Sequence, residues 1–389
     1  MKDVIVVGAG PAGTSIAKNL ADEGLDVLVL EKREEIGAPK RCGEGLSSNS
    51  AKKLNLDIPK RCIAQKINGA IVYAPNGEKL TVEFGKDTSG LVLERKLFDK
   101  WLAEEAARAG SDILTKSPAT GLLQNNKGVK ANIMMEGEQK LESKMVVAAD
   151  GFESKIMRMA GIKTNKSPDL VDSGYQYEMS NLDLEDENKI VLYFGNKLAP
   201  RGYTWIFPKG KDRANVGIGI SATHKKKTAK AYLDSFIEKY KINGSILEVN
   251  AGAIPVGGLM KNMVSDNLLG IGDAVNQVNA IHGGGIGESI KASRIASKVI
   301  KKGIEQNDTS KKTLKEYNKI WWEKRGNQLR KVEKVREIFE RLDDTHLNNF
   351  KKALSAEDLV DLAHGKKLSK VAKILAKYNL LNLKSKVGL

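Results

Sequence analysis

The sequence predicts an α/β protein with a two-domain, α+β organisation: a discontinuous domain on a parallel sheet, an antiparallel-sheet domain and a C-terminal helical region. Three observations lead to this class. A strand, a glycine turn, a helix and a second strand follow one another within residues 1–30, and such βαβ units build parallel sheets. Residues 70–84 and 174–220 are rich in β-branched and aromatic residues with turn signals, as in antiparallel hairpins. From about residue 288 onward the chain has the pattern of helices.

The length of 389 residues exceeds that of one compact unit of about 100–200 residues. Glycine-rich α/β character returns late in the chain, so we expect the first domain to be interrupted in sequence. The expected segments are 1–69, 85–165 and 256–300 for the first domain, 70–84 and 166–255 for a substrate-binding β-sheet domain, and 301–389 for the helical region.

Composition excludes several classes of protein. Hydrophobic residues make up 41% of the chain, which is enough for a core and excludes wholesale disorder. Cys42 and Cys62 are too few for a disulfide framework and lack the paired spacing of a zinc site, so we expect no metal. The sequence shows no signal-peptide pattern and no apolar run of about 18–20 residues. These features predict a cytoplasmic protein.

The net charge is +16, and the last 89 residues hold 22 Lys and Arg against 12 Asp and Glu. Such an excess indicates an anionic partner or simply a lysine-rich surface. Only Trp321 and Trp322 supply aromatic rings suited to base stacking in the basic region, so we expect no nucleic-acid partner.

The first element is the strand Val4–Val7, followed by GAGPAG at residues 8–13, a helix over Ser15–Asp22 and the strand Val27–Leu30. This is a complete GxGxxG in the strand–turn–helix setting of a Rossmann-like dinucleotide-binding domain. Glu31 ends the second strand.

Each motif residue has a physical role. Gly8 permits the tight turn, Gly10 lets the backbone approach a pyrophosphate, and Gly13 allows the helix to pack closely on the strand. The free amides at the helix N-terminus favour phosphate, and the Glu31 carboxylate accepts hydrogen bonds from ribose hydroxyls. Glu31 would repel a 2′-phosphate, so the pattern favours FAD or NAD over NADP.

Further elements of this domain are predicted in order: a helix over Lys96–Ala109, a strand over Ser111–Leu114 and a buried strand over Met145–Ala149. The last strand ends at Asp150-Gly151, which is either a simple turn or part of the site.

A second glycine motif follows the short strand that begins at Leu268: Gly272-Asp273-Ala274, and then the glycine run of residues 283–287 at the start of a helix. An N-terminal GxGxxG together with this late Gly-Asp resembles the hydroxybenzoate-hydroxylase class of FAD-binding proteins, and Asp150-Gly151 resembles its middle motif. The resemblance implies that Asp273 contacts the flavin ribityl chain and that the helix after the glycine run faces the isoalloxazine ring.

A narrower resemblance lies in PRGYTWIFP at residues 200–208, which matches PxxYxWxFP of the geranylgeranyl reductase family at every fixed position. KRCGEG at residues 40–45 resembles the cysteine loop of that family, and the similarity covers roughly residues 1–300. It implies an FAD-dependent reductase that uses hydride from reduced flavin. The reductase would saturate isolated C=C bonds of geranylgeranyl chains in archaeal membrane lipid precursors, namely 2,3-bis-O-geranylgeranylglyceryl phosphate and phospholipids.

The alternation of Tyr203, Trp205 and Phe207 places all three rings on one face of a strand. From the residues alone, this face lines a cavity for an apolar chain or belongs to the core. With the resemblance, we expect it to bind the substrate.

The resemblance also assigns FAD contacts. They fall on Ala12, Glu31, Cys42, Gly43, Gly45, Arg95, Ala119, Asp273, Gly285 and Ile286. The alternative for Arg95 is an ordinary charge at a helix start. Where family members often have Pro-x-Thr before the glycine run, this chain has residues Asn279 to His282.

An isolated alkene has no carbonyl on which negative charge can develop, so proton donation must lead or accompany hydride transfer. Tyr203, Cys42 and His282 are candidate catalytic donors, and the reduced flavin itself is a further source. Only one GxGxxG stands in a strand–turn–helix setting. The electron donor is therefore external, either NAD(P)H or a ferredoxin-like protein.

Residues 366–377 space apolar side chains at three- and four-residue intervals opposite lysines. This pattern is typical of a basic amphipathic helix on the inner membrane surface, or of a helix that packs on its own protein. Two other functions remain open: an FAD-dependent aromatic monooxygenase of the same fold, and a non-catalytic FAD- or lipid-binding protein.

Overall fold

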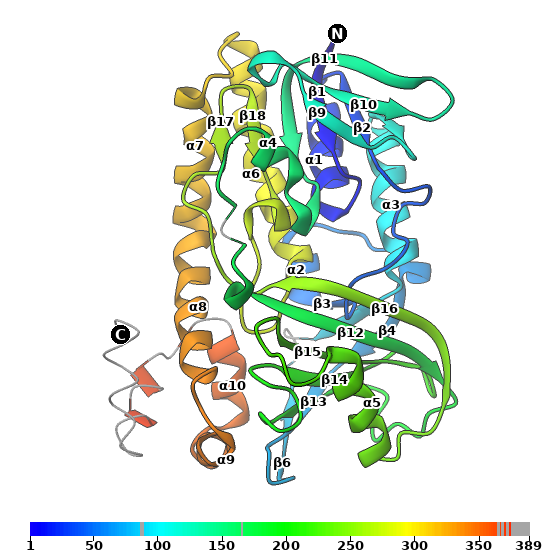
Figure 1. The fold of residues 1–389 in the computed structure, drawn as a ribbon, viewed down its shortest axis with the longest axis vertical. Coiled ribbons are helices and arrows are strands. Elements are labelled where there is room, and N and C mark those ends of the chain that lie inside the picture. Colours follow the sequence, from blue (N-terminus) through cyan, green and yellow to red (C-terminus); the bar gives the residue numbers. More distant parts are fainter. Residues whose placement is uncertain (86–88, 165, 364–365, 367–368, 371–372, 375–389) are drawn as a thin grey trace.

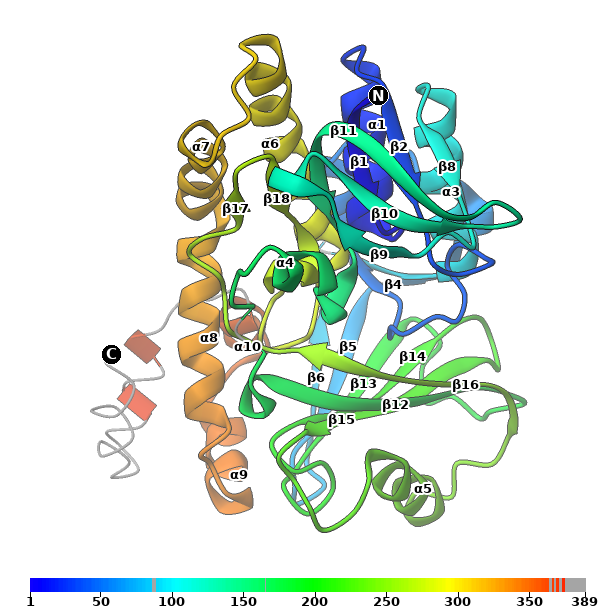
Figure 2. The same ribbon diagram turned by 45° about the horizontal axis from the view of Figure 1, so that its top comes forward.

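The structure is a computed structural model that describes residues 1–85, 89–164, 166–363, 366, 369–370 and 373–374. Its upper half in Figure 1 is an α/β domain, its lower half is a large sheet that is antiparallel except for the pair β5–β13, and a long helical segment runs along the left side of both. Figure 2 shows the same two halves from a second direction. The predicted fold class is confirmed.

The first sheet contains five parallel strands in the order β18-β11-β1-β2-β8, with β17, β9 and β10 added in antiparallel fashion. Its strands are β1 (Lys2–Val7), β2 (Val27–Leu30), β8 (Asp112–Leu114), β9 (Ala119–Leu122), β10 (Gly128–Ile133), β11 (Gly137–Ala148), β17 (Val264–Ser265) and β18 (Leu268–Gly270). The near-continuous apolar runs of β1 and β2 suit strands that are covered on both faces.

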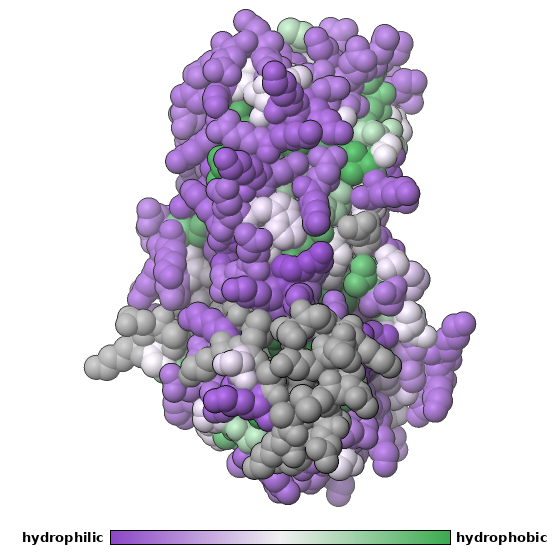
Figure 3. Space-filling model, turned by 90° about the vertical axis from the view of Figure 1, so that its left-hand side faces the viewer, coloured by the Kyte–Doolittle hydropathy of each residue, from purple (hydrophilic) through white to green (hydrophobic). Residues whose placement is uncertain are grey.

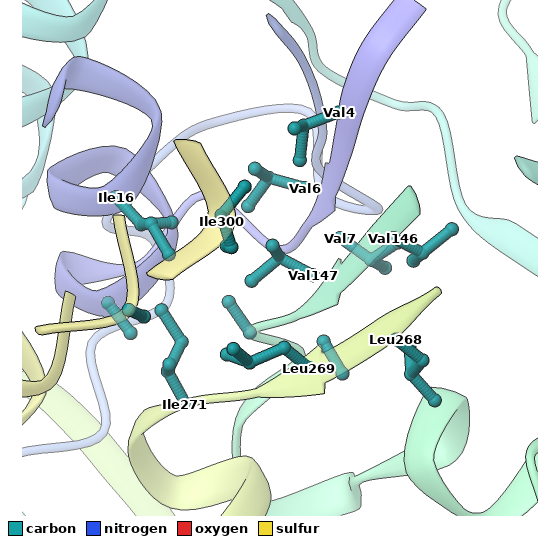
Figure 4. Packing of buried hydrophobic residues seen from close by; sticks show 14 of the residues in the cluster. Val4, Val6, Val7, Ile16, Val146, Val147, Leu268, Leu269, Ile271 and Ile300 are labelled. Atoms are coloured by element: carbon teal, nitrogen blue, oxygen red, sulfur yellow. The ribbon is translucent and has the colours of Figure 1, made fainter. Parts of the chain in front are cut away.

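Helices cover this sheet and enclose the main core. The helices are α1 (Pro11–Asp22), α3 (Arg95–Arg108), α4 (Lys155–Met159) and α6 (Ile286–Glu305). Figure 4 shows how Val6 and Val147 from neighbouring strands pack with Ile16 of α1 and Ile300 of α6. All four side chains have no solvent exposure.

The second sheet has seven strands in the order β16-β12-β15-β14-β13-β5-β6. Its strands are β5 (Gly69–Tyr73), β6 (Lys79–Glu83), β12 (Val171–Ser180), β13 (Lys189–Phe194), β14 (Tyr203–Pro208), β15 (Ala214–Ser221) and β16 (Ser245–Pro255). One face is covered by α5 (Ala229–Lys239), and Leu233 and Phe236 of that helix are fully buried. The opposite face turns toward the α/β domain (Figure 2).

A small third sheet, which the sequence analysis did not predict, lies between the two halves. It consists of β3 (Gly45–Ser47), β4 (Ile63–Ile67) and β7 (Gly90–Leu93), and α2 (Ser48–Lys53) follows its first strand. These strands are too short to show a clear period. Apart from Gly69, the first residue of β5, each sheet is confined to one group of the segments predicted above, so we propose the same division into domains, although α6 runs past residue 300 to Glu305.

The C-terminal region is helical, with α7 (Lys311–Trp321), α8 (Asn327–Phe339), α9 (Asp344–Ala353) and α10 (Ala356–Ala363). A π-helical turn over Trp322–Gly326 joins α7 to α8. Hydrophilic side chains cover most of the coloured part of the face in Figure 3, which views the molecule from the side of these helices. Most of the predicted amphipathic segment 366–377 lies outside the described residues. None of the described helices combines the length and apolar character that crossing a membrane requires.

Gly13 permits a contact that no other residue type would allow. A Cβ at this position would lie 1.8 Å from the carbonyl oxygen of Gly8, whereas a Cβ at Gly10 would have no atom within 4 Å. We expect Gly13→Ala to lower the free energy of unfolding by about 1–3 kcal/mol or more, because overpacking forces the backbone to shift. Gly10→Ala is the matched control and should unfold at the wild-type urea midpoint. Equal midpoints for both variants would contradict this account.

Candidate functional site

The glycine turn lies at the carboxyl end of β1, where α1 begins. Gly8 has φ +104°, and a Cβ there would lie 2.4 Å from the carbonyl oxygen of Ala149. The turn therefore packs directly on the end of β11, next to Asp150. Open space above Gly10 leaves the backbone of the turn accessible to a ligand.

A cavity of about 150 Å³ opens beside this turn. Its lining includes Ala9, Gly10, Glu31, Arg33, Arg41 and Arg95. The Glu31 carboxylate accepts hydrogen bonds from the backbone N–H groups of Ala9 at 2.9 Å and Arg33 at 3.0 Å. Each oxygen keeps a second lone pair for a ligand hydroxyl. An open glycine turn, basic side chains and an oriented carboxylate fit a dinucleotide diphosphate with its ribose.

The second glycine motif meets the first one in space. A Cβ at Gly272 would lie 3.0 Å from the Cβ of Ala12, and a Cβ at Gly285 would lie 3.0 Å from Oδ1 of Asp273. Gly285 is the N-cap of α6. The structure therefore brings together the residues that the two motifs predicted for one elongated ligand.

Asp273 and Asp150 carry buried carboxylates at this junction. Burial raises the pKa of Asp273, although Lys166 and Arg95 act in the opposite direction. Burial also raises the pKa of Asp150, whose Oδ2 accepts the Ile156 N–H at 3.0 Å. Its buried Oδ1 has no hydrogen-bond partner within the described residues. A buried carboxylate oxygen without a partner is suited to accept a hydroxyl of a bound ligand.

Lys166 stabilises the turn that carries Asp273 through two hydrogen bonds. Its Nζ donates to the carbonyl of Asp273 and to Oδ1 of Asn276, both at 2.6 Å, and lies 4.7 Å from the ring centre of Phe152. Burial lowers the pKa of Lys166 to about 8, against the effect of the two carboxylates.

Three predicted cofactor contacts occupy less direct positions. The guanidinium of Arg95 lines the cavity, but it is already bound to both oxygens of Asp99 at 2.8 Å. Ala119 opens β9 and packs against the main core. Ile286 begins α6 and is buried near the cysteine loop. The roles of these residues stay predictions.

The aromatic strand β14 lies on the seven-stranded sheet with its three rings in a row. The ring centres of Tyr203 and Trp205 are 5.8 Å apart, and those of Trp205 and Phe207 are 6.3 Å apart. The pairing register sets what lies beside each ring. Tyr203 pairs with Gly219, Trp205 with Gly217, and Phe207 with Asn215.

The indole of Trp205 lies flat across β15 because that strand has glycine at the point of contact. A Cβ at Gly217 would lie 2.4 Å from the indole ring. Nε1 of Trp205 donates to Oε1 of Gln176 at 2.9 Å, and Nε2 of Gln176 donates to the carbonyl of Cys42 at 3.2 Å. Gln176 therefore links the aromatic row to the cysteine loop, which we define as residues 42–45.

The cysteine loop crosses the end of the aromatic row. A Cβ at Gly43 would lie 3.1 Å from the Phe207 ring, and one at Gly45 would lie 3.4 Å from it. The backbone N–H of Glu44 donates to Sγ of Cys42 at 3.1 Å. The predicted aromatic residues and the predicted cysteine thus belong to one site, which also adjoins the glycine turn through residues that line its cavity.

Six charged side chains form a buried cluster behind this loop, and we call them the charge cluster: Lys40, Glu44, Glu94, Glu178, Lys209 and Arg213. Lys209 has no exposed side-chain surface and donates to Glu44 at 2.7 Å, Glu94 at 2.8 Å and Glu178 at 3.1 Å. Lys40 also binds Glu178. Formal charges in the cluster balance, three against three.

The other end of the aromatic row meets the helical region. The Tyr203 hydroxyl donates to the carbonyl of His282 at 3.2 Å. Arg336 of α8 binds Asp172 of β12 at 2.8 Å and donates to the carbonyl of Ala280 at 2.9 Å. Burial raises the pKa of Tyr203, and the nearby Asp172 adds to that effect. The helical region therefore holds the loop that precedes the glycine run.

Several residues of this site could not be identified from the sequence. Gln176, Lys209 and Arg336 belong to no motif, and their roles depend on pairing between distant strands and helices. Gly217 and Gly219 did carry a signal, since glycine at every second position of an apolar strand indicates that something packs on that face. No group of three or more metal-binding side chains was found among the described residues.

Comparison with known proteins shows which protein families this chain resembles. Residues 170–254 match the geranylgeranyl reductase catalytic domain, and residues 2–178 match the pyridine nucleotide-disulphide oxidoreductase domain. The chain is 38% identical to digeranylgeranylglycerophospholipid reductase 1 of Methanothermobacter thermautotrophicus, with 96% of each chain covered. It is 41% identical to digeranylgeranylglycerophospholipid reductase of Methanocaldococcus jannaschii, with 92% of each covered.

Solved structures also resemble this chain. A geranylgeranyl bacteriochlorophyll reductase-like protein from Thermoplasma acidophilum has a TM-score of 0.90 and 35% identity, with 98% of this chain and 99% of the other covered. A flavin-dependent brominase, at 18% identity and a TM-score of 0.73 over 94% and 93% of the two chains, shares the fold alone.

The contact between Trp205 and Gly217 can be tested by a matched pair of variants. Gly217→Ala should displace the indole, because the new Cβ would lie 2.4 Å from it, whereas Gly219→Ala meets the same ring at 3.7 Å, an ordinary contact. We expect Gly217→Ala to lower the free energy of unfolding by about 1–3 kcal/mol and to change tryptophan fluorescence. Gly219→Ala should change neither. Equal effects in both variants would contradict the flat packing of the indole.

The charge cluster also predicts a pH dependence. Burial alone would raise the pKa of Glu178, but Lys40 and Lys209 hold it at about 2, below the usual 4.5. A depressed carboxylate pKa stabilises the fold above the unfolded-state pKa and loses that effect as pH falls toward the folded-state pKa. The stability difference between wild type and Glu178→Gln should therefore be constant from pH 8 to pH 5 and shrink from about pH 4.5 downward. Urea unfolding at several pH values measures it.

The exposed pair Arg61–Glu104 supplies the control, with side chains 56% and 43% exposed. Glu104→Gln should change the free energy of unfolding by less than about 0.5 kcal/mol at pH 7. A pH-independent difference for Glu178→Gln would show that folding does not lower the pKa of this carboxylate.

Proposed function

The chain belongs to the geranylgeranyl reductase family, and from that membership we propose that it is an FAD-dependent reductase of geranylgeranyl lipids. Its substrates are archaeal membrane lipid precursors, 2,3-bis-O-geranylgeranylglyceryl phosphate or phospholipids, whose isolated C=C bonds it saturates. The observation that carries the proposal is the aromatic row of Tyr203, Trp205 and Phe207 beside the cysteine loop, on the sheet face that turns toward the dinucleotide-binding domain. The relatives' names support the same reaction.

FAD fits the residues at the junction of the two glycine motifs. We assign its diphosphate to the turn of Gly8, Gly10 and Gly13, its ribose to Glu31 and its ribityl chain to Asp273. When bound, reduced FAD supplies the hydride for the alkene. The remaining tasks fall to the protein: to hold the prenyl chain, to exclude water and to deliver a proton.

The aromatic row suits the first two tasks. Trp205 is only 6% exposed, and its position is set by glycine below it and by Gln176 at its edge. Rings held in this way offer an apolar wall of fixed shape, which orients a flexible chain without forming hydrogen bonds to it. Such a wall also keeps water away from the reacting carbons.

Among the three candidate proton donors, the geometry favours Cys42. Nδ1 of His282 accepts the Gly284 N–H at 3.1 Å, so in this arrangement this nitrogen is not a hydrogen-bond donor. The raised pKa of Tyr203 makes the phenol a weaker acid than usual. The Cys42 thiol lies in the loop beside the aromatic row, and its sulfur is oriented by the Glu44 N–H.

The electron donor stays a prediction, either NAD(P)H or a ferredoxin-like protein. Contact with the inner membrane surface also stays a prediction, since most of the segment that motivated it lies outside the described residues.

The proposed reaction predicts a specific mass change. Under anaerobic conditions, dithionite-reduced holoenzyme should convert digeranylgeranylglyceryl phosphate to products heavier by pairs of hydrogen atoms, as measured by mass spectrometry. Asp273→Ala is the control: it should lose FAD and form no product, because the ribityl contact is removed. A yellow protein that leaves every prenyl substrate unchanged would disprove the proposal, and oxygen-dependent hydroxylation of an aromatic compound would favour the monooxygenase alternative.

A further inference from the structure

The cysteine loop is attached to the seven-stranded sheet at each of its first three residues. Gln176 holds the Cys42 carbonyl, Nδ2 of Asn215 donates to the Gly43 carbonyl at 3.4 Å, and the Glu44 side chain enters the charge cluster. The loop precedes β3 of the small sheet, yet its hydrogen bonds reach β12 and β15 of the large one. The sheet that carries the aromatic row therefore determines where the loop lies.

Glu44 is the most strongly held residue of the loop. It has no solvent exposure and a φ of +73°, a conformation that non-glycine residues adopt only where the surroundings impose it. Its carboxylate accepts hydrogen bonds from Lys209 at 2.7 Å, from Asn215 at 2.6 Å and from the backbone N–H of Arg95 at 2.8 Å. Its backbone N–H is the group that donates to Sγ of Cys42.

Lys209 connects this residue to the aromatic row. It directly follows Pro208, the last residue of β14, so one strand end carries both Phe207 against the loop and the ammonium group that binds Glu44. The pKa of Lys209 is raised because the carboxylates of Glu44 and Glu178 outweigh the effect of burial. The side chain is thus charged at neutral pH.

Stability alone does not account for a pair buried this deeply. Well-packed apolar side chains of similar volume often stabilise a fold as well as a buried ion pair does. A charged hydrogen bond adds direction, because it holds two groups at one distance and one angle. In this site the group so directed is the backbone of Glu44, and through its N–H the thiol of Cys42.

We propose that Glu44 and Lys209 are positioning residues that fix the Cys42 thiol relative to the aromatic row. The proposal rests on the proposed function, in which Cys42 donates the proton that accompanies hydride transfer. Neither residue reacts; the pair sets the place and the orientation of the sulfur. Lys209 directly follows β14, which carries the aromatic row, and binds Glu44. A shift of the row would therefore move Glu44 and, with it, the thiol.

Two variants test the pair without leaving an unbalanced buried charge. Glu44→Asp keeps the charge and withdraws the carboxylate by one methylene. The double variant Glu44→Gln/Lys209→Met removes one charge of each sign, so the remaining cluster stays neutral. We expect both to fold and to bind FAD with a lowered urea midpoint, because buried donors such as Asn215 and the Arg95 N–H lose the Glu44 carboxylate as an acceptor. We also expect kcat for lipid reduction to fall at least about tenfold with little change in KM, since small misplacements of a reacting group are costly.

A second measurement uses no lipid. Alkylation of Cys42 by iodoacetamide, followed by peptide mass spectrometry to separate it from the buried Cys62, reports the thiolate. In both variants the rate of Cys42 alkylation at one fixed pH should fall, because the Glu44 N–H no longer faces the sulfur. Cys42→Ser identifies the signal, and Glu104→Asp, in the exposed pair with Arg61, is the control that should match wild type.

Wild-type alkylation rates and wild-type kcat in the two variants would overturn the proposal and assign the pair a purely structural role. The alkylation rate remains a valid test even if no prenyl lipid is reduced. In that case the proposed function fails, while slower alkylation of Cys42 in the variants still supports the positioning of Cys42 by the pair.

Discussion

A buried charge needs a partner, and this requirement joins the two halves of the molecule. The α/β half contributes Lys40, Glu44 and Glu94, and the large sheet contributes Glu178, Lys209 and Arg213. Lys40 pairs with Glu44 inside one half, and Glu178 pairs with Lys209 and Arg213 inside the other. Each half alone carries three of these charges and therefore leaves one without a partner, which costs several kcal/mol where the ion is buried. The relative position of the sheet and the glycine turn, and with it the shape of the site, follows from this shared requirement.

Close contacts at glycine residues determine the local shape of the site at both of its ends. At the dinucleotide end, Gly8 and Gly13 let a helix and two strands approach to distances that a methyl group would prevent. At the aromatic end, Gly217 lets an indole lie on the backbone of a strand. In both places a glycine without a side chain makes the close contact possible. A hydrogen bond to Glu31 then orients the glycine turn, and a hydrogen bond to Gln176 orients the indole.

The parts of the site that lie on consecutive residues could be predicted from the sequence. The strand–turn–helix of residues 4–22 and the alternation of residues 203–207 each carry their own period and their own turn chemistry, and the fold class follows from them. Residues such as Gln176 and Arg336 could not be found in this way, because their partners are set by strand register and helix packing. The small sheet of β3, β4 and β7 was missed for a different reason: its strands have only three to five residues and show neither a clear period nor a turn motif beside them.

The path of the chain between the two halves has a consequence for how the protein folds. β5 pairs in parallel with β13, so Gly69 lies beside Lys189 although much of the α/β domain is encoded between them. A nascent chain that has emerged only as far as β5 and β6 holds two strands without their sheet. Assembly must wait for distant segments to arrive, and such non-local topologies fold slowly. During synthesis the exposed edges of β5 and β6 would therefore be the places where association between chains competes with folding.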